Sequence, residues 1–348
     1  MTRVTITDVA KRAGVSVASA SRALNGLVAS AETIQKVRAA AAELGYTADA
    51  TARSLKLGRT NQLAYAVADI GNPVYVDMME EIERVVAASG YRLVISSTGD
   101  ADATVDLVRS LRRGFVDGMV LSPLRVTDEL VAAIADAPVP VVVLGQISDR
   151  AGADAVKADS GRGMELVIDH LVAEGRRQLA FINGPQDTTP GRFRQDGFRR
   201  AVAASPGVSA IEVTVEDFTI AEGYRAALAL LEDPACEIDA VVAANDLIGI
   251  GALHAADDLG LRIPEDIAIT GMDDTELAHV SRPGLTSVDL GASERGRIAA
   301  ELLLARIAEP GRPAHSVTVA PALHIRASSV QRTLRAASTT PRREEASA

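Results

Sequence analysis

The sequence predicts a small all-α module at the N-terminus, followed by an α/β core of two doubly wound parallel-sheet subdomains. Three observations lead to this prediction. Three short helical patterns, separated by a glycine-containing turn and a loop, occupy the first 45 residues. From Gln62 onward, short apolar runs alternate with amphipathic segments. Residues 1–60 hold nine basic and four acidic side chains, a net charge of +5, whereas the rest of the chain carries −15. A positive module on a negative body favours an anionic partner for the module alone.

Length and composition are those of a globular protein. With 348 residues, 47% of them hydrophobic, the chain can bury a large core in two or three domains. Charged residues interrupt the most apolar stretch, 238–256, and the N-terminus has no apolar signal core, so we expect a cytoplasmic protein without a membrane span. Cys236 is the single cysteine and the five histidines show no metal-ligand spacing, so no disulfide, metal or cofactor is expected.

The first helical patterns lie in the stretch VTITDVAKRAGVSVASASRALNG, residues 4–26. Thr5 with Asp8 three residues later is typical of a helix start, and apolar residues then recur at helical spacing. Gly14 permits the backbone to reverse, and Ser16 can cap a second helix over 17–25. The apolar side of this helix leaves its other residues facing outward: Val17, Ala18, Ser19, Ser21, Arg22 and Asn25.

A third helix, capped by Ser30 and ended by Gly45, completes a helix-turn-helix plan, in which the second helix enters the major groove of DNA. On that helix, Val17 and Ala18 can contact thymine methyl groups, and Arg22 can form two hydrogen bonds with a guanine. Short hydroxyl and amide groups suit phosphate contacts: Thr5, Ser16, Ser19, Ser21 and Asn25. Each of these five also fits a helix cap or a turn, and a three-helix bundle without a DNA function is the alternative.

The motifs TITDVAKRAGVSVASASRALNG and TIQKVRAAAAELGY resemble the headpiece of the LacI/GalR family of bacterial transcriptional regulators. The resemblance implies that Val17, Ala18 and Arg22 are specificity positions. It also implies that the following segment is a hinge, from which Leu55 wedges into the minor groove. A plain interdomain linker is the alternative for this segment.

From Gln62 to Ser329 the chain resembles the periplasmic-binding-protein-like core of the same family. A first set of strands and helices ends and a second set begins near Ser160. The last segments of the core are expected to complete a smaller sheet and then a larger one. The expected organisation is a headpiece 1–47, a hinge 48–60, a core 61–330 and a disordered tail 331–348. Within the core we expect an N-subdomain of about 61–159 and 291–318, and a C-subdomain of about 160–290 and 319–330.

Two doubly wound units enclose a cleft at the carboxyl ends of their strands, where polar residues are ligand candidates. The candidates are Asn72, Tyr75, Gln146, Asp159, Arg192, Arg194, Phe218, Asn245, Asp246 and Asp273. The resemblance implies that Arg194 is the ligand arginine, Asp273 the ligand carboxylate and Phe218 the packing aromatic. Carboxylates, amides, a guanidinium and aromatic faces together suit a sugar, although each polar candidate also fits a helix cap or a turn.

Enzyme motifs are lacking: the sequence has no phosphate-binding P-loop, no nucleophile elbow and no complete dinucleotide loop. The resemblance implies a transcriptional repressor that binds a near-palindromic operator as a homodimer and responds to a small molecule, with a sugar favoured. The alternatives are a purine or nucleoside effector that stacks on Phe218 and, further off, a solute-binding protein.

Overall fold

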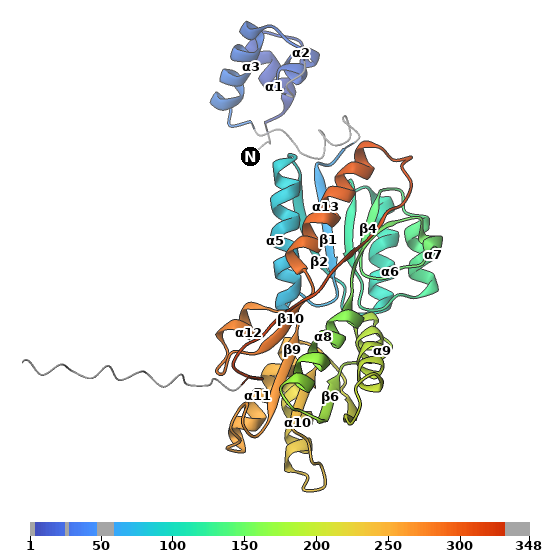
Figure 1. Cartoon of the computed structure of the whole chain (residues 1–348). Coiled ribbons are helices and arrows are strands. Elements are labelled where there is room, and N and C mark those ends of the chain that lie inside the picture. The colour runs from blue at the N-terminus through green and yellow to red at the C-terminus, as the bar shows by residue number, and fades with distance from the viewer. Residues whose placement is uncertain (1–3, 25–27, 47–58, 331–348) are drawn as a thin grey trace, which may run out of the picture. The chain divides into compact units, whose positions relative to one another are not determined.

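The computed structural model describes residues 4–24, 28–46 and 59–330, so the predictions for Asn25, Leu55 and the tail lie outside the described residues. The chain forms two compact units, which we describe separately (Figure 1). The first reaches Asn61 and includes Gly114–Asp117, and the second contains Gln62–Arg113 and the chain from Gly118 onward.

The first unit contains the predicted three-helix headpiece, with α1 (Ile6–Ala13), α2 (Val17–Leu24) and α3 (Ala31–Glu43). Gly14 adopts a left-handed conformation (φ 68°) that ends α1, and the hydroxyl of Ser30 accepts the amide of Thr33 at the start of α3. Small apolar side chains from all three helices form the core: Val9, Ala10, Ala20, Ala23, Val37, Ala40 and Ala41. The predicted helix-turn-helix fold is confirmed.

The N-subdomain is built on a fully parallel sheet with the strand order β11-β5-β4-β3-β1-β2. Gln62 pairs with Arg92, and Ala64 with Met119. The strands are β1 (Gln62–Val67), β2 (Arg92–Ser97), β3 (Met119–Ser122), β4 (Val141–Leu144), β5 (Asp154–Ala158) and β11 (Ser316–Val319). The helices are α5 (Pro73–Ala88), α6 (Ala101–Ser110), α7 (Asp128–Ala135) and α13 (Ala292–Ala308), with 3₁₀ turns at Leu111–Arg113 and Asp149–Ala151. Helices α5 and α13 lie side by side over a core that includes Tyr65 and Ile82 (Figure 1).

The C-subdomain repeats this plan with the order β12-β10-β9-β8-β6-β7, in which only the β10–β12 pair is antiparallel. Its strands are β6 (Gln178–Asn183), β7 (Ser209–Thr214), β8 (Ala240–Ala243), β9 (Ala268–Met272), β10 (Thr286–Asp289) and β12 (Ala322–His324). Its helices are α8 (Ser160–Ala173), α9 (Thr189–Ala203), α10 (Ile220–Glu232), α11 (Asp246–Asp258) and α12 (Glu276–Val280). The rings of Phe181 and Phe198 stack in its core with centroids 4.5 Å apart.

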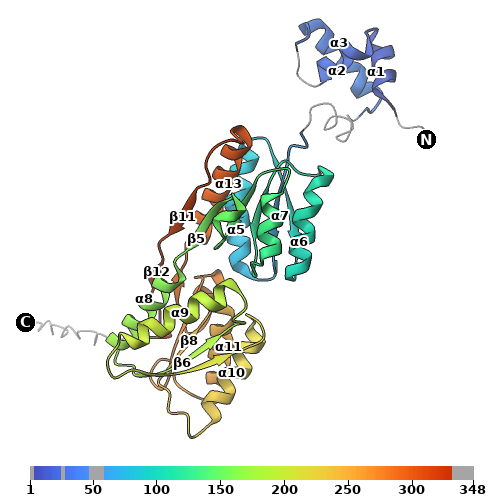
Figure 2. The same ribbon diagram turned by 90° about the vertical axis from the view of Figure 1, so that its right-hand side faces the viewer.

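The expectation of a smaller and a larger sheet is wrong, because each described sheet has six strands. Strand β5, which the sequence analysis did not recognise as a strand, and β11 both join the first sheet, whereas β10 and β12 join the second. The chain therefore crosses between the subdomains three times: from β5 to α8, from β10 to α13, and from β11 to β12 (Figure 2). In the described part of the chain, no helix has the length and apolar character needed to span a bilayer.

Candidate functional site

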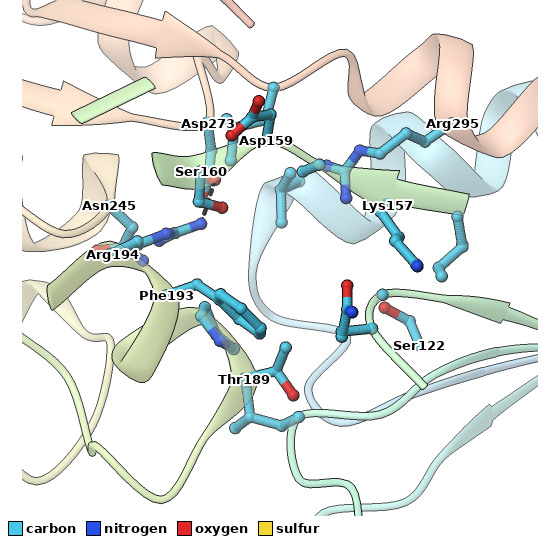
Figure 3. Close-up of a pocket in the computed structure, with 18 of the residues that line it drawn as sticks. Ser122, Lys157, Asp159, Ser160, Thr189, Phe193, Arg194, Asn245, Asp273 and Arg295 are labelled. Atoms are coloured by element: carbon cyan, nitrogen blue, oxygen red, sulfur yellow. Dashed lines mark hydrogen bonds and ion pairs between the residues drawn. The ribbon is translucent and has the colours of Figure 1, made fainter. Parts of the chain in front are cut away.

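A cavity of about 320 Å³ lies within the core, and residues from both subdomains line it (Figure 3). Ser122, Leu144 and Ala158 end strands of the first sheet. In the second sheet, Asp273 directly follows β9 and Asn245 lies two residues after β8. The cavity therefore sits at the carboxyl ends of strands from both sheets, where doubly wound folds bind ligands. Its volume is near the lower end of the range for small-molecule sites, roughly 300–1,000 Å³.

Most of the residues predicted from the sequence line this cavity: Asn72, Tyr75, Gln146, Asp159, Arg194, Phe218, Asn245 and Asp273. Arg192 and Asp246 do not line it, so their predicted placement in the cleft is wrong.

The C-subdomain wall contains a buried ion pair between Arg194 on α9 and Asp273 after β9. An Nη atom of Arg194 lies 2.9 Å from a carboxylate oxygen of Asp273, and the side chains are only 8% and 5% exposed. The other Nη atom donates to the carbonyl of Ala244. Burial raises the pKa of Asp273, whereas the positive charges of Arg194 and Arg295 oppose that shift. The pair fixes the guanidinium of Arg194 at the cavity wall.

The backbone at Asp273 is itself unusual. Asp273 and the next residue, Asp274, have positive φ angles of 106° and 50°. Residues other than glycine adopt such conformations rarely, and they do so most often at functional sites, where the surrounding structure holds them in place. The amide of Asp274 donates to Ser287 Oγ at 3.0 Å, which helps to hold this turn at the end of β9.

Three aromatic side chains contribute apolar surface: Tyr75, Phe193 and Phe218. The guanidinium carbon of Arg194 lies 6.0 Å from the centre of the Phe218 ring. A Cβ atom at Gly184 would come within 2.4 Å of that ring, so only glycine leaves room for it. Burial raises the pKa of Tyr75 to about 12, so its hydroxyl stays protonated and can donate a hydrogen bond at neutral pH.

Asn245 and Asp246 lie where the chain passes from β8 into α11, but they have different surroundings. Asn245 lines the cavity and caps α11, because its Oδ1 accepts the amide of Ile248 at 2.9 Å. Asp246 points away from the cavity, and its carboxylate accepts hydrogen bonds from Thr275 and Ser287. It therefore holds the loop after β9 against the start of α11. Burial, and then the charge of Asp273, raise the pKa of Asp246 to about 7, although these hydrogen bonds oppose the shift.

Arg192 is exposed on α9, with its guanidinium carbon 5.3 Å from the ring centre of Phe193. Phe193, the next residue, lines the cavity in its place. Successive helical residues point about 100° apart, so the two arginines of the R-F-R motif differ by about 200° and cannot both face the cavity with the phenylalanine between them. The identity of the inward residues depends on how α9 is rotated against its sheet, which the motif alone does not specify.

The sequence analysis missed several polar residues of the cavity: Ser122, Lys157, Ser160, Thr189, Arg200, Arg295 and Thr318. Ser122 ends β3 and was recognisable by the same strand-end argument as the others. Lys157 interrupts an apolar strand that the analysis did not identify. Arg295 lies in the first turns of α13, and nothing in its neighbouring sequence distinguishes it from a surface arginine.

Two contacts join the subdomains beside the cavity. Arg125 donates two hydrogen bonds to the carboxylate of Asp187, at 2.6 and 3.2 Å. The amide of Thr189 donates to the carbonyl of Leu124 at 2.8 Å. Arg125 and Leu124 follow β3, whereas Asp187 and Thr189 follow β6, so these contacts hold the two lobes together across the cleft.

On α2 of the headpiece, the residues predicted to contact DNA base edges are exposed. Val17 is 44% exposed, and Ala18 and Arg22 are exposed as well. Arg12 pairs with Glu43, and Lys36 with Glu32 at 2.7 Å, but no carboxylate in the described part of the chain pairs with Arg22. Its guanidinium is therefore exposed and has no ion-pair partner among the described residues.

The residues expected to contact phosphates vary in exposure. Ser16 and Thr5 are exposed, and Ser19 is half-buried. Ser16 Oγ accepts the amide of Ser19 at 3.1 Å, and Thr5 donates to the Asp8 carboxylate, so both also act as helix-end residues. Ser21 is only 8% exposed, so the expectation that it faces outward is wrong. It lies one residue after Ala20, and the side of α2 that packs in the core is wide enough to include both. The phosphate contacts themselves stay predictions.

A helix-turn-helix headpiece and a two-lobed core with a polar, aromatic-lined cavity define a DNA-binding regulator with an effector-binding domain. Residues 5–49 match the family model for bacterial regulatory proteins of the lacI family, and residues 168–329 match a periplasmic binding protein-like domain. The ribose operon repressor of Escherichia coli (strain K12) is 33% identical over 93% of this chain and 99% of its own length. The chain belongs to the LacI family of transcriptional repressors, which are DNA-binding proteins and not enzymes.

Solved structures agree with this assignment. A lac repressor dimer bound to operator and the anti-inducer ONPF has a TM-score of 0.85 with 25% identity, and the match covers 95% of this chain and all of that one. The transcriptional regulator CelR in complex with cellobiose has a TM-score of 0.70 with 30% identity, covering 94% of this chain and all of the other. Within the described residues, no group of three or more His, Cys, Asp or Glu side chains is placed to hold a metal ion.

Proposed function

We propose that this repressor is controlled by a sugar of about monosaccharide size that binds in the cavity of the core. The observation that carries the proposal is the cavity wall, where the fixed guanidinium of Arg194 and the carboxylate of Asp273 lie beside the aromatic ring of Phe218. Sugar hydroxyls require paired donors and acceptors, and sugar C–H faces pack on aromatic rings. Ribose and cellobiose in the names of related proteins support the same ligand class.

The ligand would act through the relative position of the two lobes. It would contact both walls of the cavity at once, so its affinity would depend on whether the lobes are closed. A difference in ligand affinity between DNA-bound and free repressor is what would couple the two sites. We propose that the hinge 48–60 transmits this difference, with Leu55 as the wedging residue, and that induction rather than corepression is the response.

At the operator, we propose that the chain acts as a homodimer on a near-palindromic site. Val17, Ala18 and Arg22 would read base edges in each half-site, whereas Thr5, Ser16, Ser19 and Asn25 would contact the DNA backbone. The exposed and internally unpaired guanidinium of Arg22 supports its role as the main reading residue.

The test is fluorescence anisotropy with duplexes selected from a random pool, with and without a panel of sugars and nucleosides. We expect tight binding to a palindromic duplex that one sugar weakens. Asp273→Asn should bind the same duplex but lose the sugar response, and Arg22→Ala should bind the duplex more weakly, with a relaxed base preference at one position of each half-site. If no selected duplex is bound more tightly than random DNA, the regulatory proposal is wrong. A response to a nucleoside alone would replace the sugar.

A further inference from the structure

The charge of the cavity differs from that of the core around it. Two acidic residues line the cavity, Asp159 and Asp273, against four basic residues: Lys157, Arg194, Arg200 and Arg295. The chain beyond residue 60 carries a net charge of −15, so this local excess of positive charge is not a property of the surrounding surface.

Arg194 and Arg295 are both buried at the cavity, but among the described residues only Arg194 of the two has an ion-pair partner. Arg295 is 8% exposed, and its Nε atom, like that of Arg194, has no hydrogen-bond partner there. In the described part of the chain, no carboxylate lies within ion-pair distance of it. Asp273 attracts it only through space, because that carboxylate is bonded to Arg194. Burial lowers the pKa of Arg295, the charge of Asp273 opposes that shift, and the nearby positive charge of Arg194 adds to it.

Lys157 is a second cation on the same wall. It lies on β5 and is half-buried, and no carboxylate among the described residues pairs with it. Figure 3 shows the side chains of Lys157 and Arg295 directed into the cavity, on the side away from Arg194. The carboxylate of Asp159 is exposed and already accepts the amide of Arg162 at 2.9 Å as the cap of α8.

We infer that the effector carries an anionic group, a carboxylate or a phosphate, and that Arg295 and Lys157 bind this group. The inference rests on the proposed function, since it names the class of ligand for the same cavity. A buried cation is stabilised by an opposite charge with good geometry, and the two-pronged guanidinium matches carboxylate and phosphate oxygens. A neutral sugar would leave the positive charge of this wall uncompensated. The ligand is then a sugar acid or a sugar phosphate, with its hydroxyls on the Arg194 side.

The experiment is isothermal titration calorimetry on the full chain with two matched series. One series is ribose, ribonate and ribose 5-phosphate, and the other is glucose, gluconate and glucose 6-phosphate, with inorganic phosphate alone as a seventh probe. We expect an acid or a phosphate ester to bind at least about tenfold more tightly than its neutral parent, as charge-assisted hydrogen bonds imply. The two arms of each series separate a carboxylate ligand from a phosphate ligand.

Calorimetry on variants then identifies the side chains that bind the anionic group. Arg295→Gln should reduce the advantage of the anionic ligand to about threefold or less, and Lys157→Met should reduce it in part. The matched control is Arg297→Gln, which removes an arginine from the same helix, where Arg297 pairs with Glu301 at 2.8 Å outside the cavity. This control should keep the full preference. Arg295→Lys, which keeps the positive charge but not the planar guanidinium, should keep part of the preference for the anionic ligand. Circular dichroism checks that each variant folds.

The affinities of the wild-type protein for the neutral and the anionic probes test the inference even if a variant fails to fold. The inference is overturned if no anionic probe binds, if a neutral parent binds as tightly as its derivatives, or if folded Arg295→Gln keeps the full preference. These outcomes are distinct from failure of the proposed function. Anion binding without any effect on operator affinity would overturn the regulatory proposal alone, whereas operator release by a neutral sugar would overturn only this inference.

Discussion

The DNA-reading surface of the headpiece and the cavity of the core both present basic side chains that no carboxylate of the described residues pairs with, but they do so in opposite environments. Arg22 is exposed, so water solvates its charge and leaving it unpaired has little effect on stability. Arg295 is buried, so the same charge is unfavourable until an anion arrives. The comparison indicates that an exposed charge can lack a partner in the free protein without destabilising the fold. Buried charges couple the stability of the fold to the presence of the ligand.

The largest expected effect tests the buried side of this comparison. Asp273→Ala leaves Arg194 buried without its partner, beside a second unpaired guanidinium. We expect the free energy of unfolding of the core to fall by about 3 to 5 kcal/mol. Urea denaturation followed by circular dichroism measures it. The control is Asp187→Ala, which removes the exposed partner of Arg125 and should cost less than about 1 kcal/mol. Similar losses in the two variants would contradict the distinction between buried and exposed charge.

An effect of similar size is expected from pH, through Asp246. Burial raises the pKa of its carboxyl in the folded chain to about 7, from an ordinary value of 3.8. Its stabilising contribution is therefore fully present below about pH 4 and is lost as the pH rises through about 7. Each pKa unit corresponds to about 1.4 kcal/mol, so the loss is on the order of 4 kcal/mol.

The matched variant for this prediction is Asp246→Asn, which stays neutral and keeps the shape of the side chain. Urea denaturation of both proteins between pH 4 and pH 8 gives the difference in their free energies of unfolding. The wild-type protein should lose stability relative to the variant as the pH rises, and a difference that does not change with pH would show that the buried carboxyl does not titrate in this range.

The exposed side of the comparison is tested by Arg22→Ala. We expect a loss of about 1 to 3 kcal/mol in binding to the selected operator and a relaxed base preference at one position of each half-site. Anisotropy titrations against the operator and its single-base variants measure both. Arg12→Ala is the control, because Arg12 already pairs with Glu43 within the headpiece. Equal losses on operator and random DNA would remove Arg22 from the base-reading set.

The smallest effect is expected at the contact between the lobes. Arg125 and Asp187 have side chains that are 31% and 64% exposed, so their ion pair contributes at most about 1 kcal/mol. Arg125→Gln should increase hydrogen exchange at the amide of Thr189, which bonds to Leu124 in the other lobe, by about fivefold or less. Exchange measured by mass spectrometry checks this, with Arg150→Gln, whose ion pair with Asp128 stays within one lobe, as the control. An unchanged rate would show that this pair does not hold the lobes together.

Much of the site was predictable where a cavity residue also lies at the end of a strand or caps a helix. Asn72, Asn245 and Asp273 directly follow strands or cap helices, so strand-end reasoning placed them at the cavity. The same reasoning failed for Asp246, because the direction of its side chain depends on Thr275 and Ser287 in a neighbouring loop and strand. It also failed for Ser21, whose burial depends on how α2 packs against the other two helices of the headpiece.

The sequence by itself determined the helix-turn-helix headpiece, the two-lobed class of the core and most of the order of helices and strands, with β5 as an exception. These features depend on hydrophobic periodicity and on capping residues, which act over a few positions along the chain. Only the tertiary structure decided which charges share the cavity. Lys157 and Arg295 lie far apart in the sequence, and both line the cavity because the chain leaves the N-subdomain after β5 and returns to it at α13. Whether a charge is buried and unpaired depends on every element packed around it, and no local pattern specifies that.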